Sequence, residues 1–131
     1  MMCRERMIEL ARQARDNAYA PYSGFRVGAC LVTAAGNVYT GCNVENAAHS
    51  PACCAERNAV FQAVARGERE FAAICVVAGA REPVWPCGVC LQVLSEFSRD
   101  MRVITASLSG EVRESSIDRL LPCAFGDYTK G

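Results

Sequence analysis

The chain has 131 residues, of which 51% are hydrophobic and 21% are charged. This length predicts one domain, residues 1–131, with a single hydrophobic core, and the composition excludes a disordered chain. Its 14 basic and 14 acidic side chains give a formal net charge of +0, so nothing indicates attraction to nucleic acid or another polyanion.

The first part of the chain is predicted to form a helix followed by a β-hairpin. Apolar residues recur at helical spacing over residues 7–18, and Pro21 ends this helix. Residues 25–33 and 38–44 are apolar, β-compatible runs on either side of a turn at residues 34–37. We therefore expect two antiparallel strands after the first helix.

The rest of the chain alternates helices and strands. Ser50 is a suitable N-cap and Pro51 suits the first helical position, so a second helix is predicted from there to Arg66, before Gly67. The later elements are a buried strand at 71–78, a helix that Cys87 opens, short strands at 102–106 and 111–114, and a short helix at 117–121. This order predicts an α/β fold, a three-layer α/β/α sandwich around a mixed, mostly five-stranded sheet.

Two short motifs carry the chemistry, Cys54-Ala55-Glu56-Arg57 and Pro86-Cys87-Gly88-Val89-Cys90. A catalytic zinc ion needs three protein ligands and an open fourth position for water. Cys87 and Cys90 at i and i+3 of a helix start share one face, and the positive helix end favours thiolates there. We therefore predict one zinc ion per chain, bound by Cys54, Cys87 and Cys90.

Glu56 is the predicted catalytic acid and base. It follows Cys54 by two residues, so on a helix its side chain leaves at a wide angle from the sulfur and can stand beside the metal without binding it. A lone C-x-x-C is also typical of a structural zinc half-site or a redox pair. The combination of C-A-E with P-C-x-x-C favours a zinc-dependent base deaminase instead.

Segments along nearly the whole chain match one known family. They are Ala20-Pro21-Tyr22-Ser23, Phe25-Arg26-Val27-Gly28-Ala29, Gly41-Cys42-Asn43-Val44-Glu45-Asn46-Ala47, the two cysteine motifs, Gln92-Val93-Leu94-Ser95-Glu96-Phe97, and Leu120-Leu121-Pro122 followed by Phe125-Gly126. With them the chain resembles the cytidine/deoxycytidylate deaminases, in particular the small, homotetrameric type with three zinc cysteines. The resemblance implies the cytidine deaminase-like fold and zinc-dependent deamination of cytidine, and of deoxycytidine, to uridine or deoxyuridine and ammonia in pyrimidine salvage.

The resemblance also implies a set of substrate contacts. Asn43 and Glu45 would bind the ribose, Phe25 and Phe125 would line the base and sugar pocket, Tyr22 would lie near the 5′ end of the sugar, and the backbone of Ala55 would read the base edge. Without the resemblance, Asn and Glu at a strand-to-loop junction are more often turn and surface residues. The three aromatic residues could equally be packed core or loop residues.

Two positions depart from the family pattern. His49 stands where the family commonly has Tyr, in a loop that reaches toward a neighbouring subunit's site, so we expect a homotetramer with shared active sites in which His49 makes that contact. Leu91 stands where the family commonly has Arg, which leaves Arg57 as the nearby cation outside the metal ligands. His49 is not expected to bind zinc, because three cysteines already fill the ligand positions.

Other function classes remain open at this point. A deaminase of a blasticidin-type antibiotic would share the zinc motifs but lack the ribose pair Asn43 and Glu45, and a non-catalytic zinc module would not need Glu56. The substrate is expected to be a small nucleoside rather than nucleic acid. The 9 cysteines and the absence of an apolar signal region in residues 1–10 indicate a reducing compartment, the cytoplasm. No apolar run approaches the roughly 20 residues of a membrane span.

Overall fold

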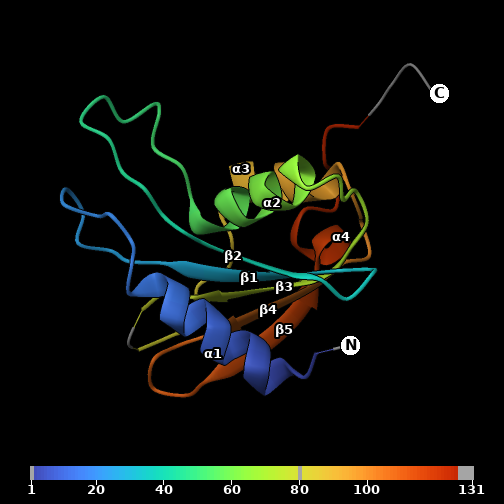
Figure 1. Cartoon of the computed structure of the whole chain (residues 1–131), viewed down its shortest axis with the longest axis horizontal. Coiled ribbons are helices and arrows are strands. Elements are labelled where there is room, and N and C mark those ends of the chain that lie inside the picture. The colour runs from blue at the N-terminus through green and yellow to red at the C-terminus, as the bar shows by residue number, and fades with distance from the viewer. Residues whose placement is uncertain (1, 80, 127–131) are drawn as a thin grey trace.

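A mixed sheet with the strand order β2-β1-β3-β4-β5 lies at the centre of the molecule (Figure 1). The structure is a computed structural model that describes residues 2–79 and 81–126. The strands are β1 (Gly28–Thr33), β2 (Val38–Cys42), β3 (Phe71–Val77), β4 (Arg102–Ala106) and β5 (Val112–Ser116), and the helices are α1 (Arg4–Arg15), α2 (Ala55–Ala65), α3 (Gly88–Ser95) and α4 (Ile117–Leu120). Within the sheet, β3 and β4 pair in parallel, and the other neighbouring strands are antiparallel.

Helices cover both faces of this sheet (Figure 1). On one face α1 buries Met7 and Ala11 against Cys30 and Cys75 of the central strands. On the other face α2, α3 and α4 share an apolar cluster with residues of β1, β3 and β4. The predicted three-layer α/β/α sandwich with a mixed five-stranded sheet is therefore confirmed.

Two glycines let the helices approach the sheet closely. A Cβ on Gly28 of β1 would lie 1.9 Å from the carbonyl oxygen of Ala11 in α1. A Cβ on Gly41 of β2 would lie 2.5 Å from the carbonyl oxygen of Ala55 and 2.7 Å from the amide nitrogen of Ala59, both in α2. Because these are backbone atoms, any larger residue at either position would displace a helix.

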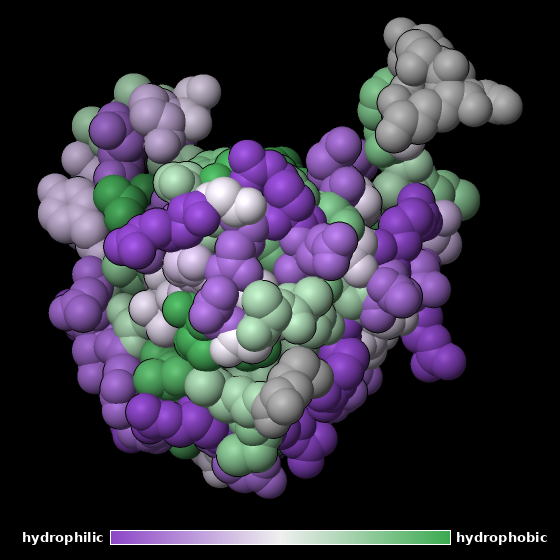
Figure 2. Space-filling view, turned by 45° about the vertical axis from the view of Figure 1, so that its right-hand side comes forward, coloured by the Kyte–Doolittle hydropathy of each residue, from purple (hydrophilic) through white to green (hydrophobic). Residues whose placement is uncertain are grey.

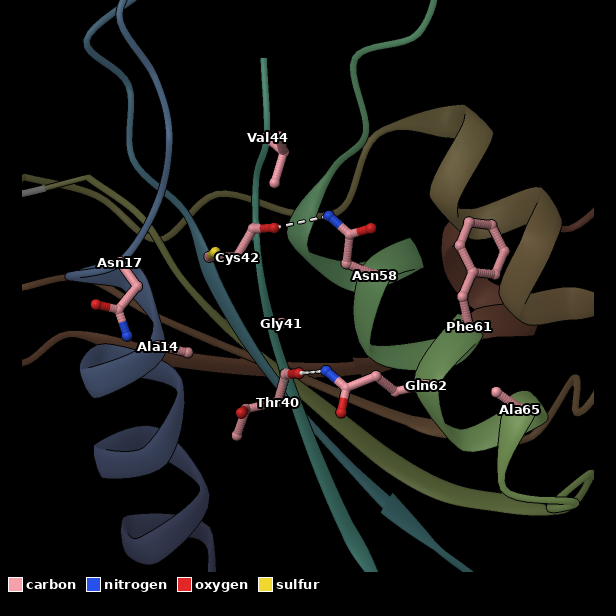
Figure 3. Close-up of a pocket in the computed structure, with 10 residues that line it drawn as sticks. All are labelled: Ala14, Asn17, Thr40, Gly41, Cys42, Val44, Asn58, Phe61, Gln62 and Ala65. Atoms are coloured by element: carbon pink, nitrogen blue, oxygen red, sulfur yellow. Dashed lines mark hydrogen bonds between the residues drawn. The ribbon is translucent and has the colours of Figure 1, made fainter. Parts of the chain in front are cut away.

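Side chains of α2 cover the edge strand β2 (Figure 3). Asn58 Nδ2 donates to the carbonyl oxygen of Cys42, and Gln62 Nε2 donates to that of Thr40, both at 2.8 Å. Four helical residues rise about 6 Å and two strand residues about 7 Å, so side chains at i and i+4 match alternate carbonyls of the strand. These two carbonyls are satisfied although no strand pairs with this edge in the described part of the chain.

Three predicted boundaries were wrong near the loops that precede the metal motif. The first helix ends at Arg15 rather than residue 18, and β1 begins at Gly28 rather than at residue 25. The second helix begins at Ala55 rather than at Pro51. The reason for this last difference is that Cys53 pairs with Val44 through two backbone hydrogen bonds of 2.9 Å, which keep the chain extended up to Cys54.

Candidate active site with a zinc centre

The Sγ atoms of Cys54, Cys87 and Cys90 all lie within 4.8 Å of one another. Those of Cys54 and Cys87 are 3.8 Å apart. Zinc–sulfur bonds of about 2.3 Å in a tetrahedron separate the sulfurs by about 3.8 Å. The three predicted ligands are thus brought together at a spacing that fits zinc.

Two helix starts hold these sulfurs in place. Cys54 is the N-cap of α2, and Cys87 is the N-cap of α3, whose first turn contains Cys90. The first helical hydrogen bonds run from Asn58 N to Cys54 O at 3.2 Å and from Leu91 N to Cys87 O at 2.9 Å. Both N-termini present their positive dipole ends to the cluster, which stabilises thiolates.

The cluster of thiols also has a nearby cation. Nη2 of Arg57 lies 3.5 Å from Sγ of Cys54. A hydrogen bond from the Cys90 thiol, with a further contribution from Arg57, lowers the pKa of Cys54 to about 5. The hydrogen bond with the Cys54 thiolate raises the pKa of Cys90. Among the described residues, Nε of Arg57 is buried without a hydrogen-bond partner, so this guanidinium is held mainly by its contacts with sulfur.

Glu56 is a buried residue beside the clustered cysteines. Its exposed fraction is 4%, and it lines one cavity together with Cys54 and Cys87. Desolvation raises the pKa of Glu56 to about 7. A carboxyl of this kind can both accept and release a proton near neutral pH, which is what a general acid and base must do.

The cavity beside the sulfurs has a volume of about 280 Å³, just below the roughly 300–1,000 Å³ typical of small-molecule sites. Three of the predicted substrate residues, Phe25, Asn43 and Glu45, line it. Asn43 holds the segment that precedes β1. Its Oδ1 accepts a hydrogen bond from Val27 N at 2.8 Å, and its Nδ2 donates one to Phe25 O at 2.9 Å. One N–H of its amide is left for a ligand.

The other residues predicted to contact substrate or a neighbouring subunit do not line this cavity. Tyr22 and His49 line a neighbouring hollow of about 280 Å³, which shares Ser23 and Glu45 with the cavity. Ala55 is fully buried at the start of α2. The side chain of Phe125 is 74% exposed and does not line the cavity.

Sequence reasoning gave no site role to six residues that line the cavity: Ser23, Val27, Val76, Ala78, Val84 and Trp85. Val84 and Trp85 lie directly before the second cysteine motif. The hydroxyl of Thr105, a buried residue of β4, donates to the carbonyl oxygen of Val84 at 2.7 Å and fixes this segment. Their place in the sequence could have indicated this role, because Trp85-Pro86 directly precedes Cys87. Their side chains add an apolar wall next to a zinc ligand.

A buried carboxyl beside three thiols at helix starts, within a three-layer α/β/α fold, defines the class of zinc-dependent base deaminases. Residues 1–107 match the family described as "Cytidine and deoxycytidylate deaminase zinc-binding region". The chain belongs to this family.

Individual relatives agree with this assignment. The chain is 48% identical to a cytidine deaminase of Sporosarcina psychrophila, over 92% of this chain and 90% of the relative. It is 46% identical to one of Halalkalibacterium halodurans, with 95% of each chain covered. The crystal structure of cytidine deaminase from Burkholderia pseudomallei superposes with a TM-score of 0.92 at 50% identity, covering 95% of this chain and 100% of that chain.

The antibiotic deaminases are more distant. A blasticidin-S deaminase of Bacillus cereus is 27% identical over 90% of this chain and 91% of its own length. The comparisons therefore favour the cytidine deaminases over the alternative left open by the sequence. In the part of the chain that the structure describes, no helix is long and apolar enough to cross a membrane.

Proposed function

We propose that the protein catalyses the zinc-dependent hydrolytic deamination of cytidine and deoxycytidine to uridine or deoxyuridine and ammonia, in pyrimidine salvage. The observation that carries this proposal is the shared cavity, which is lined by Glu56, by two of the three clustered cysteines, and by Asn43 and Glu45. The relatives named cytidine deaminase support the choice of substrate.

The proposed mechanism assigns proton transfer to Glu56. Zinc held by Cys54, Cys87 and Cys90 would supply Lewis-acid activation of water as the nucleophile at neutral pH. Glu56, whose pKa burial raises to about 7, accepts a proton from water as the water oxygen bonds to C4, and passes this proton to N3 of cytosine. It then takes the remaining proton of the new C4 hydroxyl and delivers it to the amino nitrogen, so that the C4–N bond breaks as the C4 carbonyl forms. Protonation of that nitrogen lets it leave as ammonia.

Asn43 and Glu45 are proposed to hold the sugar, so that C4 of the base is presented to the zinc centre. Phe25 and the apolar wall next to Cys87 would exclude water from the base. Because the sugar contacts anchor the nucleoside, free cytosine is expected to be a poor substrate. The single test is incubation of the purified protein with cytidine and with cytosine, followed by ultraviolet absorbance. Equal efficiency on both would contradict the nucleoside assignment.

One zinc per chain is proposed, with Cys54, Cys87 and Cys90 as its ligands. Metal analysis of the parent and of Cys87→Ala tests this proposal, with Cys123→Ala, an exposed cysteine outside the cluster, as the matched control. We expect zinc loss in the first variant only. Full zinc content and activity in Cys87→Ala would show that the ligand set is different.

We further propose a homotetramer with shared active sites. The loop between β2 and α2, which carries His49, projects beyond the body of the domain, and so does the segment after α4, which carries Phe125 (Figures 1 and 2). The backbone of Phe125 is tied to Gln92 by hydrogen bonds of 2.8 and 3.1 Å, while its ring is 74% exposed. This arrangement suits an aromatic ring that closes the cavity of a neighbouring copy.

A second surface supports association. A groove of about 610 Å³ runs between α1, β2 and α2 (Figure 3). Phe61 of α2 lines it and is 51% exposed. Light scattering is expected to report four copies. Co-expression of Phe125→Ala with Glu56→Gln should restore activity above either variant alone, because mixed assemblies contain sites with both residues intact. An active monomer would contradict the proposal.

The proposed location is the cytoplasm. All nine cysteines are free thiols, which fits a reducing compartment. Cell fractionation with an activity assay tests this point, and activity confined to an extracellular fraction would contradict it.

A further inference from the structure

The hydroxyl of Ser23 lies between two residues of the proposed substrate cavity. It donates a hydrogen bond to Oε2 of Glu45, and it accepts one from the backbone N–H of Phe25 at 2.9 Å. Ser23 belongs to the loop between α1 and β1, whereas Glu45 follows β2. One side-chain oxygen therefore links the residue proposed to bind the sugar with the backbone of an aromatic residue in the same cavity.

The two oxygens of Glu45 are used differently. Oε1 accepts the backbone N–H groups of Tyr22 and Ser23, at 2.9 and 3.1 Å, which fills its two acceptor positions. Oε2 accepts only the Ser23 hydroxyl among the described residues, so one acceptor position remains. The carboxylate can thus accept one more hydrogen bond, at Oε2, from a ligand hydroxyl.

Docking of the two loops does not depend on the Ser23 hydroxyl. The backbone N–H groups already join the loop to Oε1 of Glu45, and Tyr19 pairs with the chain around Val44 through backbone hydrogen bonds of 2.9 and 2.8 Å. What the hydroxyl adds is the orientation of Oε2, the oxygen with free capacity. A fixed acceptor loses less conformational entropy when a ligand binds.

We propose that Ser23 is a positioning residue for sugar recognition, whose hydroxyl orients Oε2 of Glu45 to accept a hydrogen bond from one hydroxyl of the substrate's sugar. This inference rests on the proposed assignment of Glu45 to the sugar. Ser23 itself need not touch the reacting atoms. The Ser23 hydroxyl also accepts a hydrogen bond from the N–H of Phe25, so the backbone of this aromatic residue helps to fix the position of the hydroxyl.

The charge on Glu45 agrees with this role. The Ser23 hydroxyl is the main cause that holds the pKa of Glu45 below its ordinary value, and the N–H groups of Ser23 and Tyr22 and the charge of His49 act in the same direction. The carboxylate therefore stays ionised, as an acceptor must. Loss of the hydroxyl should raise the pKa of Glu45, so that sugar binding fails at a higher pH on the acid side.

The test compares Ser23→Ala with the parent on two substrates, cytidine and 2′,3′-dideoxycytidine, which lacks the 2′ and 3′ hydroxyls of the sugar. We expect Ser23→Ala to lower kcat/KM for cytidine about tenfold or more, since a hydrogen bond to a charged group contributes that much. The same change should alter kcat/KM for dideoxycytidine less than threefold.

Two further variants complete the design. Ser23→Thr keeps a hydroxyl and should recover most of the activity on cytidine. Ser98→Ala removes a comparable hydroxyl–carboxylate bond, to Asp100 at 2.7 Å, and should leave both substrates unaffected.

The outcomes separate two ideas. If the parent treats both substrates alike, the assignment of Glu45 to the sugar is wrong. If the parent prefers cytidine but Ser23→Ala keeps the same preference, or loses both activities equally, the Ser23 proposal is overturned while the proposed function stands.

Discussion

Nη2 of Arg57 lies 3.5 Å from Sγ of Cys54, one helical turn away on α2. This contact predicts that the guanidinium stabilises the Cys54 thiolate. The pKa of Cys54 is lowered to about 5, so in zinc-depleted protein this thiol should already react with iodoacetamide near pH 6. Arg57→Gln removes the charge and should shift the midpoint of the rate profile to higher pH, as followed by peptide mass spectrometry.

Buried cysteines provide the internal control for that experiment. Desolvation raises the pKa of Cys30 to about 11 and that of Cys75 to about 12, so neither should be modified while the chain is folded. Circular dichroism establishes that the zinc-depleted chain keeps its fold. An unchanged midpoint in Arg57→Gln would mean that the thiolate depends on the helix ends and the neighbouring thiols alone.

Glu56→Gln is expected to lower kcat for cytidine by about 10² to 10⁴, the usual contribution of a general acid and base. Zinc content and melting temperature should stay close to those of the parent, because Gln has nearly the same shape. The matched control is Glu68→Gln, at a half-buried position that accepts hydrogen bonds from Asn37 and Tyr39 and does not line the cavity. Activity near the parent level in Glu56→Gln would remove this residue from the mechanism.

Leu91 has a packing role that its position after Cys90 did not suggest. Its side chain is 6% exposed and belongs to the apolar cluster that contains Ala55 and Leu94. Leu91→Ala should therefore lower the free energy of unfolding by about 2–5 kcal/mol, measured by urea denaturation. Val89→Ala on the same helix, at a position 58% exposed, should change it by less than about 0.5 kcal/mol.

Gly41→Ala tests the coupling between sheet packing and the active site. The added Cβ would lie 2.5 Å from Ala55 O and 2.7 Å from Ala59 N, so α2 must move, and Cys54 and Glu56 with it. We expect a loss of stability of about 1–3 kcal/mol and a fall in kcat, because a shift of about 1 Å can cost up to about 10²-fold in rate. Gly126→Ala, where nothing lies within 4 Å of the added Cβ, should be neutral. A fully active Gly41→Ala would show that the helix adapts.

The clustering of the three cysteines proposed to bind zinc could be predicted in part from the sequence, because two of them are neighbours on one helix. Cys87 and Cys90 are three residues apart at a helix start, so short-range rules place their sulfurs on one face. The second helix was predicted from Pro51 but begins at Ala55, so the position of Cys54 as its N-cap was not predicted. The meeting of the two helix starts also required the tertiary fold. The layer order could likewise be predicted from the alternation of helices and strands.

What the sequence did not predict depends on contacts between distant segments. The start of α2 is delayed by the pairing of Cys53 with Val44, and a strand-like bridge of one residue leaves no periodic signal. Trp85 and Val84 line the cavity because Thr105 of β4 holds the backbone there. The position of Phe125 outside the cavity of its own chain also follows from the tertiary path and not from a local pattern.

The bonds from Asn58 and Gln62 to the carbonyl oxygens of Cys42 and Thr40 have a consequence for how copies of the chain can meet. A sheet that ended in free carbonyls here could grow by adding a strand from another molecule, which is the route to fibrillar aggregates. With these acceptors occupied by side chains of α2, continuous sheet growth across this edge is disfavoured. Any contact between copies at this edge is therefore expected to involve side chains of the flanking helices rather than added strands.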